Sequence, residues 1–257
     1  MMTLFVLKGV VKQVPVMSKK SENNLLLALE ASGEAVSVAL VKQDGVVTFK
    51  QHEARFGHAE HLVDMVQSAM HDAGASFSEL THIAAGCGPG SFTGLRVCLS
   101  AAKGYLLATS AMALGVNGLA AIALTTITEG KSDQKKQGPL ICFADTRRKS
   151  LFTQEFDQQA KMLSPVRDVP LDQIPVYIEE TNLRFGGQYL TLAGHVASLS
   201  DLLPTNKHII CQQRPANAQM IAHYALHSLS SPQIYPCFGL EPLYVVAPKI
   251  GPAKRQV

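Results

Sequence analysis

Apolar and polar positions change their spacing several times along this chain, and each change predicts an element. Residues 25–29 and 35–41 are almost wholly apolar, which predicts two buried strands. Lys42-Gln43-Asp44-Gly45 follows them and predicts a hairpin turn, because Asp-Gly tolerates the positive φ of tight turns. Residues 46–50 then form the third strand of a predicted antiparallel meander.

A helix is predicted from about His58 to Ala73, because its apolar residues recur at helical spacing. They are Leu62, Met65, Val66, Ala69, Met70 and Ala73. Gly74 ends this helix. The pattern then predicts, in order, a buried strand at 82–87, a helix at 95–110, a strand at 112–116 and a helix from 118 to about 128, with Asn117 as its N-cap.

The second half repeats part of this plan after a polar stretch at 129–138, which predicts an inter-domain linker. Strands at 140–144 and 150–156 enclose a turn at Asp145–Lys149, so strand, acidic residue, turn and strand occur twice. This repetition suggests duplicated halves. Beyond Lys161 prolines are frequent, and the clearest elements are a strand at 190–193, a helix at 217–229 and an extended tail from Pro232.

We divide the chain into an N-terminal half at residues 24–128 and a C-terminal half with its tail at 129–257. Residues 1–23 read as a disordered leader or as an overextended start, since Met17-Ser18-Lys19-Lys20 resembles a natural beginning.

Composition narrows the classes of function. Charged residues are 17% of the chain, against about 25% in a typical soluble domain, which hints that part of the surface is covered. The net charge of +3 is a small excess for a dedicated nucleic-acid binder. The densest basic spots are Lys135–Lys136, Arg147–Lys149 and Lys254–Arg255, which read as solvated loops.

The five cysteines are odd in number, widely spread and without a Cys-x-x-Cys pair. They therefore indicate neither a disulfide framework nor a zinc knuckle, and they favour a reducing cytosol. The uncharged run at residues 104–128 is long enough for a membrane helix, but Gly115-Val116-Asn117-Gly118 interrupts it. No membrane span is predicted.

The most informative segment runs from Gly86 to Arg96 and reads as a strand, a glycine-rich turn and a helix start. Such a junction can bind an anion, with Ser91 or Thr93 capping the helix, but it is also common without a ligand. It matches neither the P-loop nor the dinucleotide-binding spacing. The helix that follows has small residues and a broad apolar surface, which core packing and a subunit interface explain equally well.

Gly88-Pro89-Gly90-Ser91-Phe92-Thr93-Gly94-Leu95-Arg96 resembles the signature of the TsaB (YeaZ) family. His58-Ala59-Glu60-His61-Leu62 resembles that family's His-Ser-Glu-x-Leu helix start, Asp145-Thr146-Arg147 its Asp-Ala-Arg turn, and Pro242-x-Tyr244 its C-terminal motif. Two positions depart from the pattern. Glu30-Ala31-Ser32 stands where Asp-Thr-Ser is usual, and Val246 stands where an arginine is expected.

The resemblance implies an α/β, actin-like fold of two βββαβαβα-type halves, as in sugar kinases, Hsp70 and other ribonuclease H-like proteins. It implies a cytoplasmic, non-catalytic subunit that pairs with TsaD and is joined by TsaE. The complex would transfer threonylcarbamoyl to adenosine 37 of tRNAs that read ANN codons. ATP and metal would bind TsaD, and no cofactor would bind this chain tightly. The chain would contact tRNA through the complex. Whether the isolated chain forms a homodimer is left open.

The same resemblance assigns roles to residues. The interface with TsaD would involve His58, Leu62, Met65, Val66, Ala69, Leu95, Leu99, Ala102 and Tyr105. The glycine junction would be a motif or anion-binding turn, and a vestigial nucleotide site would comprise Glu30, Ser32 and Asp145. No catalytic residue and no metal ligand is expected.

Three alternatives remain open beside this hypothesis. An independent ATP-binding or phosphotransfer protein would need acids for Mg²⁺ in both halves, and only Glu30 and Asp145 occupy matching positions. A metalloprotease could use His58 and His61, but the glutamate of the zincin motif is absent. Direct tRNA binding could use Arg147–Lys149, although three charges give limited affinity.

Overall fold

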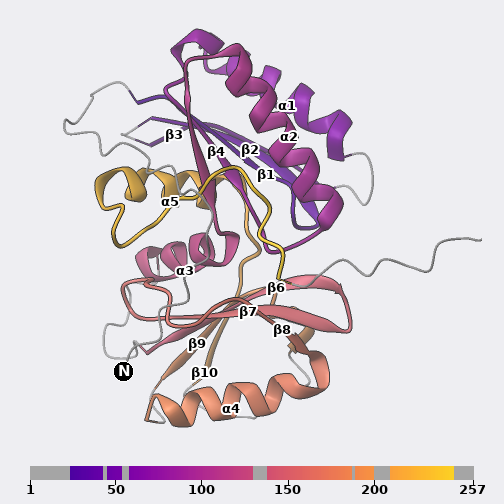
Figure 1. Ribbon diagram of the computed structural model, residues 1–257, viewed down its shortest axis with the longest axis vertical. Helices are drawn as coiled ribbons and strands as arrows, with labels where there is room; N and C mark the ends of the chain where they lie inside the picture. Colours follow the sequence, from indigo (N-terminus) through magenta and orange to yellow (C-terminus); the bar gives the residue numbers. More distant parts are fainter. Residues whose placement is uncertain are drawn as a thin grey trace, which may run out of the picture.

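The computed structural model describes residues 24–42, 45–53, 58–129, 138–186, 189–199 and 209–245. The predicted leader, the centre of the predicted hairpin turn, residues 130–137 of the predicted linker and the tail beyond residue 245 lie outside these described residues, as do the side chains of residues 58–60. The described elements stack in five layers, helices, sheet, helices, sheet and helix (Figure 1).

Five strands form the first sheet in the order β3-β2-β1-β4-β5. They are β1 (Leu26–Glu30), β2 (Ala35–Lys42), β3 (Gly45–Glu53), β4 (His82–Gly86) and β5 (Met112–Val116). The first three pair antiparallel, which confirms the predicted meander, and β4 and β5 run parallel to β1. Every residue of β1 and β4 is buried, because helices cover both faces of this sheet.

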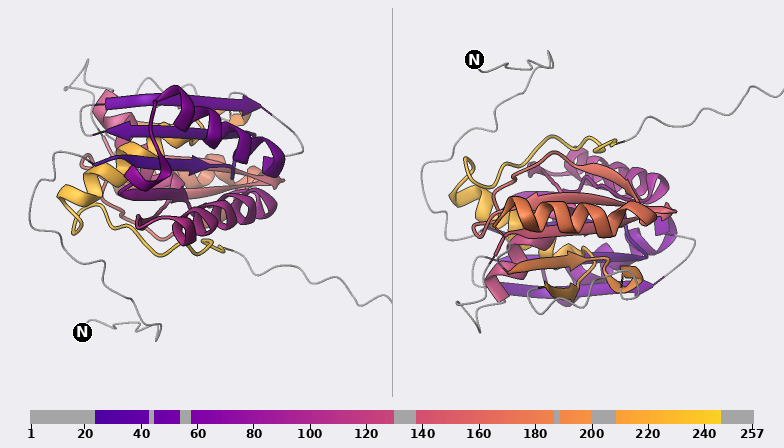
Figure 2. Two further views of the ribbon diagram at one scale, coloured as in Figure 1. Left: turned by 90° about the horizontal axis from the view of Figure 1, so that it is seen from above. Right: turned by 90° about the horizontal axis from the view of Figure 1, so that it is seen from below.

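Two helices, α1 (His58–Asp72) and α2 (Phe92–Ala108), cover the outer face of the first sheet (Figure 2, left). Strand alternation divides the core: Leu27 and Leu29 of β1 pack under these outer helices, whereas Leu26 packs on the inner side. The apolar stripe predicted for the first helix is therefore the surface that binds the sheet.

The second sheet repeats the first, with the order β8-β7-β6-β9-β10. Its strands are β6 (Leu140–Arg148), β7 (Ser150–Phe156), β8 (Arg167–Pro170), β9 (Leu190–Gly194) and β10 (Ile209–Gln213). The helix α4 (Ile174–Arg184) covers its outer face (Figure 2, right). Two sheets with the same strand order and the same mixture of parallel and antiparallel pairs confirm the duplicated actin-like fold.

The middle layer consists of α3 (Gly118–Glu129) and α5 (Ala218–Ser230), and each packs on the sheet of the other half. The helix α3 contacts β6, β7 and β9, whereas α5 contacts β1, β2 and β4. Asn117 caps α3 by accepting from the Leu119 amide at 2.9 Å, and its Nδ2 donates to Gln154 Oε1 at 2.8 Å. The packing therefore crosses the division of the chain at residues 128 and 129.

Residues 231–245, which we call the C-terminal strap, follow α5 and lie along the free edge of β5. Phe238 forms an antiparallel bridge with Gly115, and Leu240 is buried in the outer core. The predicted extended tail is thus, over these residues, a part of the packed structure.

Among the strands and α-helices that the structure describes, the sequence pattern missed β8, α4 and β10. One predicted turn is also shorter than expected. Instead of ending before Asp145, β6 continues to Arg148 through an irregularity in its pairing with β7, where Arg147 has a φ of 56°. The strand therefore carries the residues that were assigned to a loop. Short 3₁₀ helices occur at Phe77–Glu79, Leu171–Gln173 and Ala197–Leu199.

Candidate functional site

The glycine junction connects β4 to α2. The Gly88–Pro89 peptide is cis, and Gly88 has a φ of 98°, a conformation that other residues rarely adopt. Ser91 is the N-cap of α2, because its Oγ accepts from the Gly94 amide at 3.3 Å. Of the two predicted caps, Ser91 is therefore confirmed, while Thr93 lies inside the helix with an exposed side chain.

Three glycines of this segment allow close packing against the turn that follows β1. A Cβ atom at Gly86 would overlap the Glu30 carboxylate, one at Gly90 would overlap Ser32, and one at Gly94 would overlap the Ala31 carbonyl. The Ser91 amide also donates to the Ser32 carbonyl at 2.8 Å. The junction thus uses its missing side chains, and one of its amides, to join the start of α2 to the first sheet.

Glu30 is fully buried, and its two carboxylate oxygens have different surroundings. Oε1 accepts from the Ser32 amide at 2.5 Å, whereas Oε2 has no hydrogen-bond partner within the described part of the chain. Burial raises the pKa of this carboxyl, against the opposing effect of hydrogen bonds from Ser32 and Ala31. Burial and the Glu30 charge likewise raise the pKa of the neighbouring Cys87 thiol to about 12.

Asp145, the third member of the predicted nucleotide site, lies toward the end of β6, at the equivalent place in the second half. Its Oδ1 accepts from the Arg147 amide at 2.8 Å. Arg147 in turn reaches across to the first half, where its Nη2 donates to the Gly33 carbonyl at 2.8 Å. The structure therefore links the turn after β1 to the end of β6 through Arg147, while the carboxylate of Glu30 is directed at Ser32 and Gly86.

The predicted interface list needs a correction at six positions. Their side chains are almost wholly buried in the core of this chain, because an apolar stripe on a helix turns toward the sheet and away from solvent. They are Leu62, Val66, Ala69, Leu95, Leu99 and Ala102. Met65 and Tyr105 are half-buried, with the Tyr105 ring stacked on Phe77 at 5.5 Å, and the side chain of His58 lies outside the described residues.

The outward side of the same two helices presents other residues, which the sequence pattern did not single out. Val63 of α1 is 43% exposed and Leu107 of α2 is 92% exposed. A Cβ atom at Gly104, one turn before Leu107, would meet no neighbouring atom within 4 Å. We refer to these exposed positions on two neighbouring helices, Val63 on α1 and Gly104 and Leu107 on α2, as the outer helical face. The sequence did contain a signal for this face, because Val63 and Leu107 are apolar residues outside the main apolar stripe of their helices.

Two motifs that are distant in the sequence meet at the start of α2. The Phe92 and Tyr244 rings lie 5.6 Å apart, and the Arg96 guanidinium lies 3.8 Å from the centroid of the Phe92 ring. Leu243, beside Tyr244, donates its amide to the Cys87 carbonyl at 2.8 Å. The C-terminal strap thus brings the Pro242-x-Tyr244 motif onto the glycine junction, with Phe92, Arg96 and Tyr244 at the surface.

The histidines gather in a way that their sequence spacing did not predict. His52 of β3 and His61 of α1, which are distant in the sequence, have ring centroids 4.2 Å apart. Among the residues that the structure describes, no group of three or more His, Cys, Asp or Glu side chains could hold a metal ion. Over the same residues, no helix is both long and apolar enough to span a membrane.

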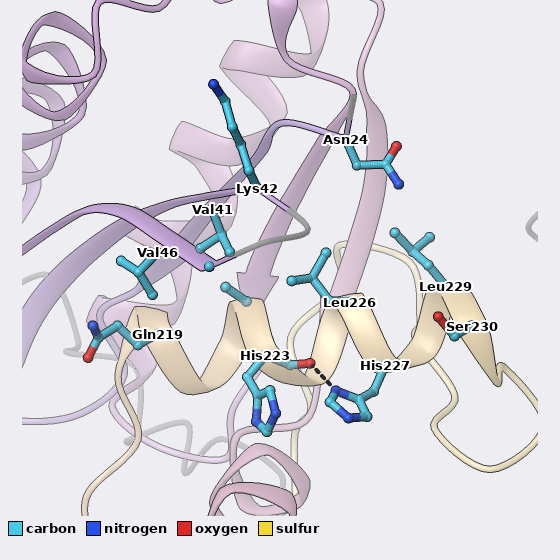
Figure 3. A pocket seen from close by; sticks show the side chains of 12 residues that line it. Asn24, Val41, Lys42, Val46, Gln219, His223, Leu226, His227, Leu229 and Ser230 are labelled. Atoms are coloured by element: carbon cyan, nitrogen blue, oxygen red, sulfur yellow. Dashed lines mark hydrogen bonds between the residues drawn. The ribbon is translucent and has the colours of Figure 1, made fainter. Parts of the chain in front are cut away.

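A pocket of about 390 Å³ lies at the other end of the first sheet, between the β2–β3 hairpin and α5. Figure 3 shows Val41, Val46 and Leu226 on its walls, while the Lys42 side chain points away from the helix. His227 Nδ1 donates to the carbonyl of His223 on the same helix at 2.9 Å. The strand β2 runs from the glycine junction to this pocket, so the two features lie at opposite ends of the sheet.

Comparison with known proteins adds to this geometry. A family model described as TsaD, tRNA N6-adenosine threonylcarbamoyltransferase, matches residues 41–180, which is more than half of the chain. The chain is 25% identical over 167 residues to the tRNA threonylcarbamoyladenosine biosynthesis protein TsaB of Escherichia coli, covering 65% of this chain and 70% of that protein. It is 33% identical over 102 residues to TsaB of Haemophilus influenzae, covering 40% and 43%.

A solved structure has the same fold. YeaZ from Pseudomonas aeruginosa superimposes with a TM-score of 0.68 over 86% of this chain and 99% of that chain, at 22% sequence identity. Both sheets of the present structure therefore have a known counterpart.

Proposed function

We propose that this chain, which belongs to the TsaD family and is similar to TsaB and YeaZ proteins, is a TsaB-type subunit in the biosynthesis of tRNA threonylcarbamoyladenosine. In this proposal it is cytoplasmic and pairs with TsaD, and TsaE joins them. The complex transfers threonylcarbamoyl to adenosine 37 of tRNAs reading ANN codons, with the chemistry on TsaD.

The observation that carries the pairing is the outer helical face. Leu107 is 92% exposed, and Val63 on the neighbouring helix is 43% exposed. Removing such apolar side chains from water would be favourable. A glycine inside an exposed helix costs about 1 kcal/mol relative to alanine, so Gly104 is costly for the isolated chain. Both costs are offset if a partner helix packs closely on this face.

A charge on this face is expected to break the pairing without unfolding the chain. Leu107→Glu and Val63→Glu should each weaken the complex with TsaD by about thirtyfold, the effect typical of a central interface residue. The matched control is Leu183→Glu on α4, which is 69% exposed on the opposite side of the molecule and should pair normally. Co-purification with TsaD, followed by size-exclusion chromatography, measures the difference.

Buried positions on the same helices give a different outcome. Leu62→Glu and Leu99→Glu would place a charge in the outer core, so they should unfold the chain, which circular dichroism detects. If Leu107→Glu and Val63→Glu both pair as well as the control, the proposed docking surface is wrong.

We also propose that this chain neither binds ATP tightly nor catalyses transfer. The support is that Arg147 joins the end of β6 to the turn after β1, the two segments that would enclose a nucleotide, and that Glu30 is buried against Gly86. Equilibrium dialysis of the isolated chain with ATP should show no saturable binding. Threonylcarbamoyl transfer or ATP hydrolysis by the isolated chain above background would contradict the proposal.

A further inference from the structure

The N-terminal end of α2 carries two exposed aromatic rings in contact with each other. Phe92 is 43% and Tyr244 is 50% exposed, and Arg96 lies over the Phe92 ring. Large aromatic side chains contribute most to the stability of a fold or a complex when their rings are buried. Arg96 covers one face of the Phe92 ring, so the exposed parts of the two rings and the planar guanidinium are the surfaces suited to stacking with another planar group.

A basic turn lies next to this pair, although it is distant in the sequence. Arg147, Arg148 and Lys149 are exposed where β6 meets β7. The hydrogen bond from Arg147 to Gly33 places this turn against the first half. The carbonyl of Ser32, the neighbour of Gly33, accepts a hydrogen bond from the amide of Ser91, which directly precedes Phe92. In Figure 1 the end of the β6–β7 hairpin, the start of α2 and the end of the C-terminal strap lie toward the same side of the molecule.

The positive charges here are available to a ligand. Within the part of the chain that the structure describes, Arg96, Arg148 and Lys149 form no ion pair. Three acids share these segments, namely Glu34, Asp145 and Glu241, and Asp145 is engaged with the Arg147 amide. The excess of positive charge is therefore small, and a ligand must gain from the rings as well as from the charges.

We infer that Phe92, Arg96, Tyr244 and the turn Arg147–Lys149 form a stacking platform for an unpaired RNA loop. Bases stack on the rings, and the neighbouring phosphates lie against the basic turn. A loop is specified because the faces of paired bases are already covered by their neighbours in the helix. A protein partner would have to neutralise three unpaired cations, whereas an RNA backbone brings that charge with it.

This inference rests on the proposed function, in which RNA is the substrate of the complex, and it assigns a direct RNA contact to this chain. The outer helical face, at Val63, Gly104 and Leu107, is a separate set of residues. The failure of one proposal can therefore be distinguished from the failure of the other.

The test is fluorescence anisotropy of the full chain with a fluorescein-labelled stem–loop RNA and with a blunt duplex RNA of similar length. The stem–loop should bind more tightly than the duplex. Phe92→Ala/Tyr244→Ala should weaken stem–loop binding about tenfold and abolish the preference over the duplex. Arg148→Glu/Lys149→Glu should weaken binding of both RNAs and make it less sensitive to salt.

The matched control is Lys42→Glu/Lys161→Glu, which makes the same change of net charge at the opposite ends of the two sheets. It should bind the stem–loop like the wild type, and thermal unfolding should show that all variants are folded. The inference is overturned if the control loses as much binding as the platform variants, or if the wild type does not prefer the stem–loop. It is also overturned if the platform variants lose TsaD and keep RNA, since the surface would then be a protein interface.

Discussion

Replacing Gly94 with alanine is expected to destabilise the folded chain by about 3 kcal/mol, the upper part of the range for overpacking. The added Cβ would overlap the backbone carbonyl of Ala31, which is anchored at the end of a fully buried central strand. Backbone cannot swing aside as the end of a flexible side chain does. The start of α2 would have to move away from the first sheet, and the bond between Ser91 and Ser32 would be strained with it.

The same helix supplies the control. Gly104→Ala adds an identical methyl group where no atom lies within 4 Å, so it should stabilise α2 by about 1 kcal/mol through helix propensity alone. Thermal unfolding followed by circular dichroism measures both effects. The melting temperature of Gly94→Ala should be lower than that of the wild type by roughly 6–12 °C, and that of Gly104→Ala should be slightly higher. Equal behaviour of the two variants would contradict the close approach of α2 and the turn after β1.

Most elements of the first half could be predicted from the sequence, because local chemistry and tertiary packing agree there. The apolar stripe of α1, the buried strands and the caps Ser91 and Asn117 are signals that reside in a few neighbouring residues. The duplication also left a readable trace in the recurrence of strand, acid, turn and strand.

The second half was harder to predict, because its signals are weaker or not local. The helix α4 was missed because Pro175 reads as a helix breaker, although proline is tolerated in the first turn, where it stands. The strand β8 has only four residues, and β10 is a half-exposed edge strand without a continuous apolar run. Such strands are recognisable only from the partners with which they pair.

The candidate site could be located from the sequence but not oriented. The glycine motif indicated a turn between a strand and a helix, yet nothing in its spacing says that the turn packs closely against Glu30–Ser32. The interface residues were chosen from the apolar stripe, and that stripe is the side of a helix that a sheet covers. Residues such as Leu107 become informative only when the covered side is known.

Replacing Glu30 with glutamine is expected to change how stability depends on pH. The carboxyl is fully buried, one oxygen lacks a partner within the described chain, and burial raises its pKa above the ordinary value of 4.5. The folded protein therefore holds this proton more tightly than the unfolded chain does. The stability linked to Glu30 is present below pH 4.5 and is lost as the pH rises through the pKa of the folded state.

Glutamine has nearly the same shape as glutamate and does not ionise. The substitution therefore changes the free energy of unfolding by an amount that does not depend on pH, and it removes the loss of stability caused by ionisation of Glu30. The stability of Glu30→Gln relative to the wild type should thus increase with pH, by up to about 1.4 kcal/mol for each unit through which the pKa is raised. Urea unfolding of both proteins between about pH 4 and pH 9 measures the difference, in which contributions of other titrating groups cancel.

Glu79→Gln provides a control of the opposite sign. Hydrogen bonds from the backbone and side chain of Ser76 lower the pKa of Glu79, so its contribution is present above its unfolded pKa and lost as the pH falls. Relative to the wild type, Glu79→Gln should become less stable as the pH rises, while Glu30→Gln becomes more stable. A flat or falling difference for Glu30→Gln would mean that Glu30 finds a compensating partner in solution, and that the turn after β1 opens to reach it.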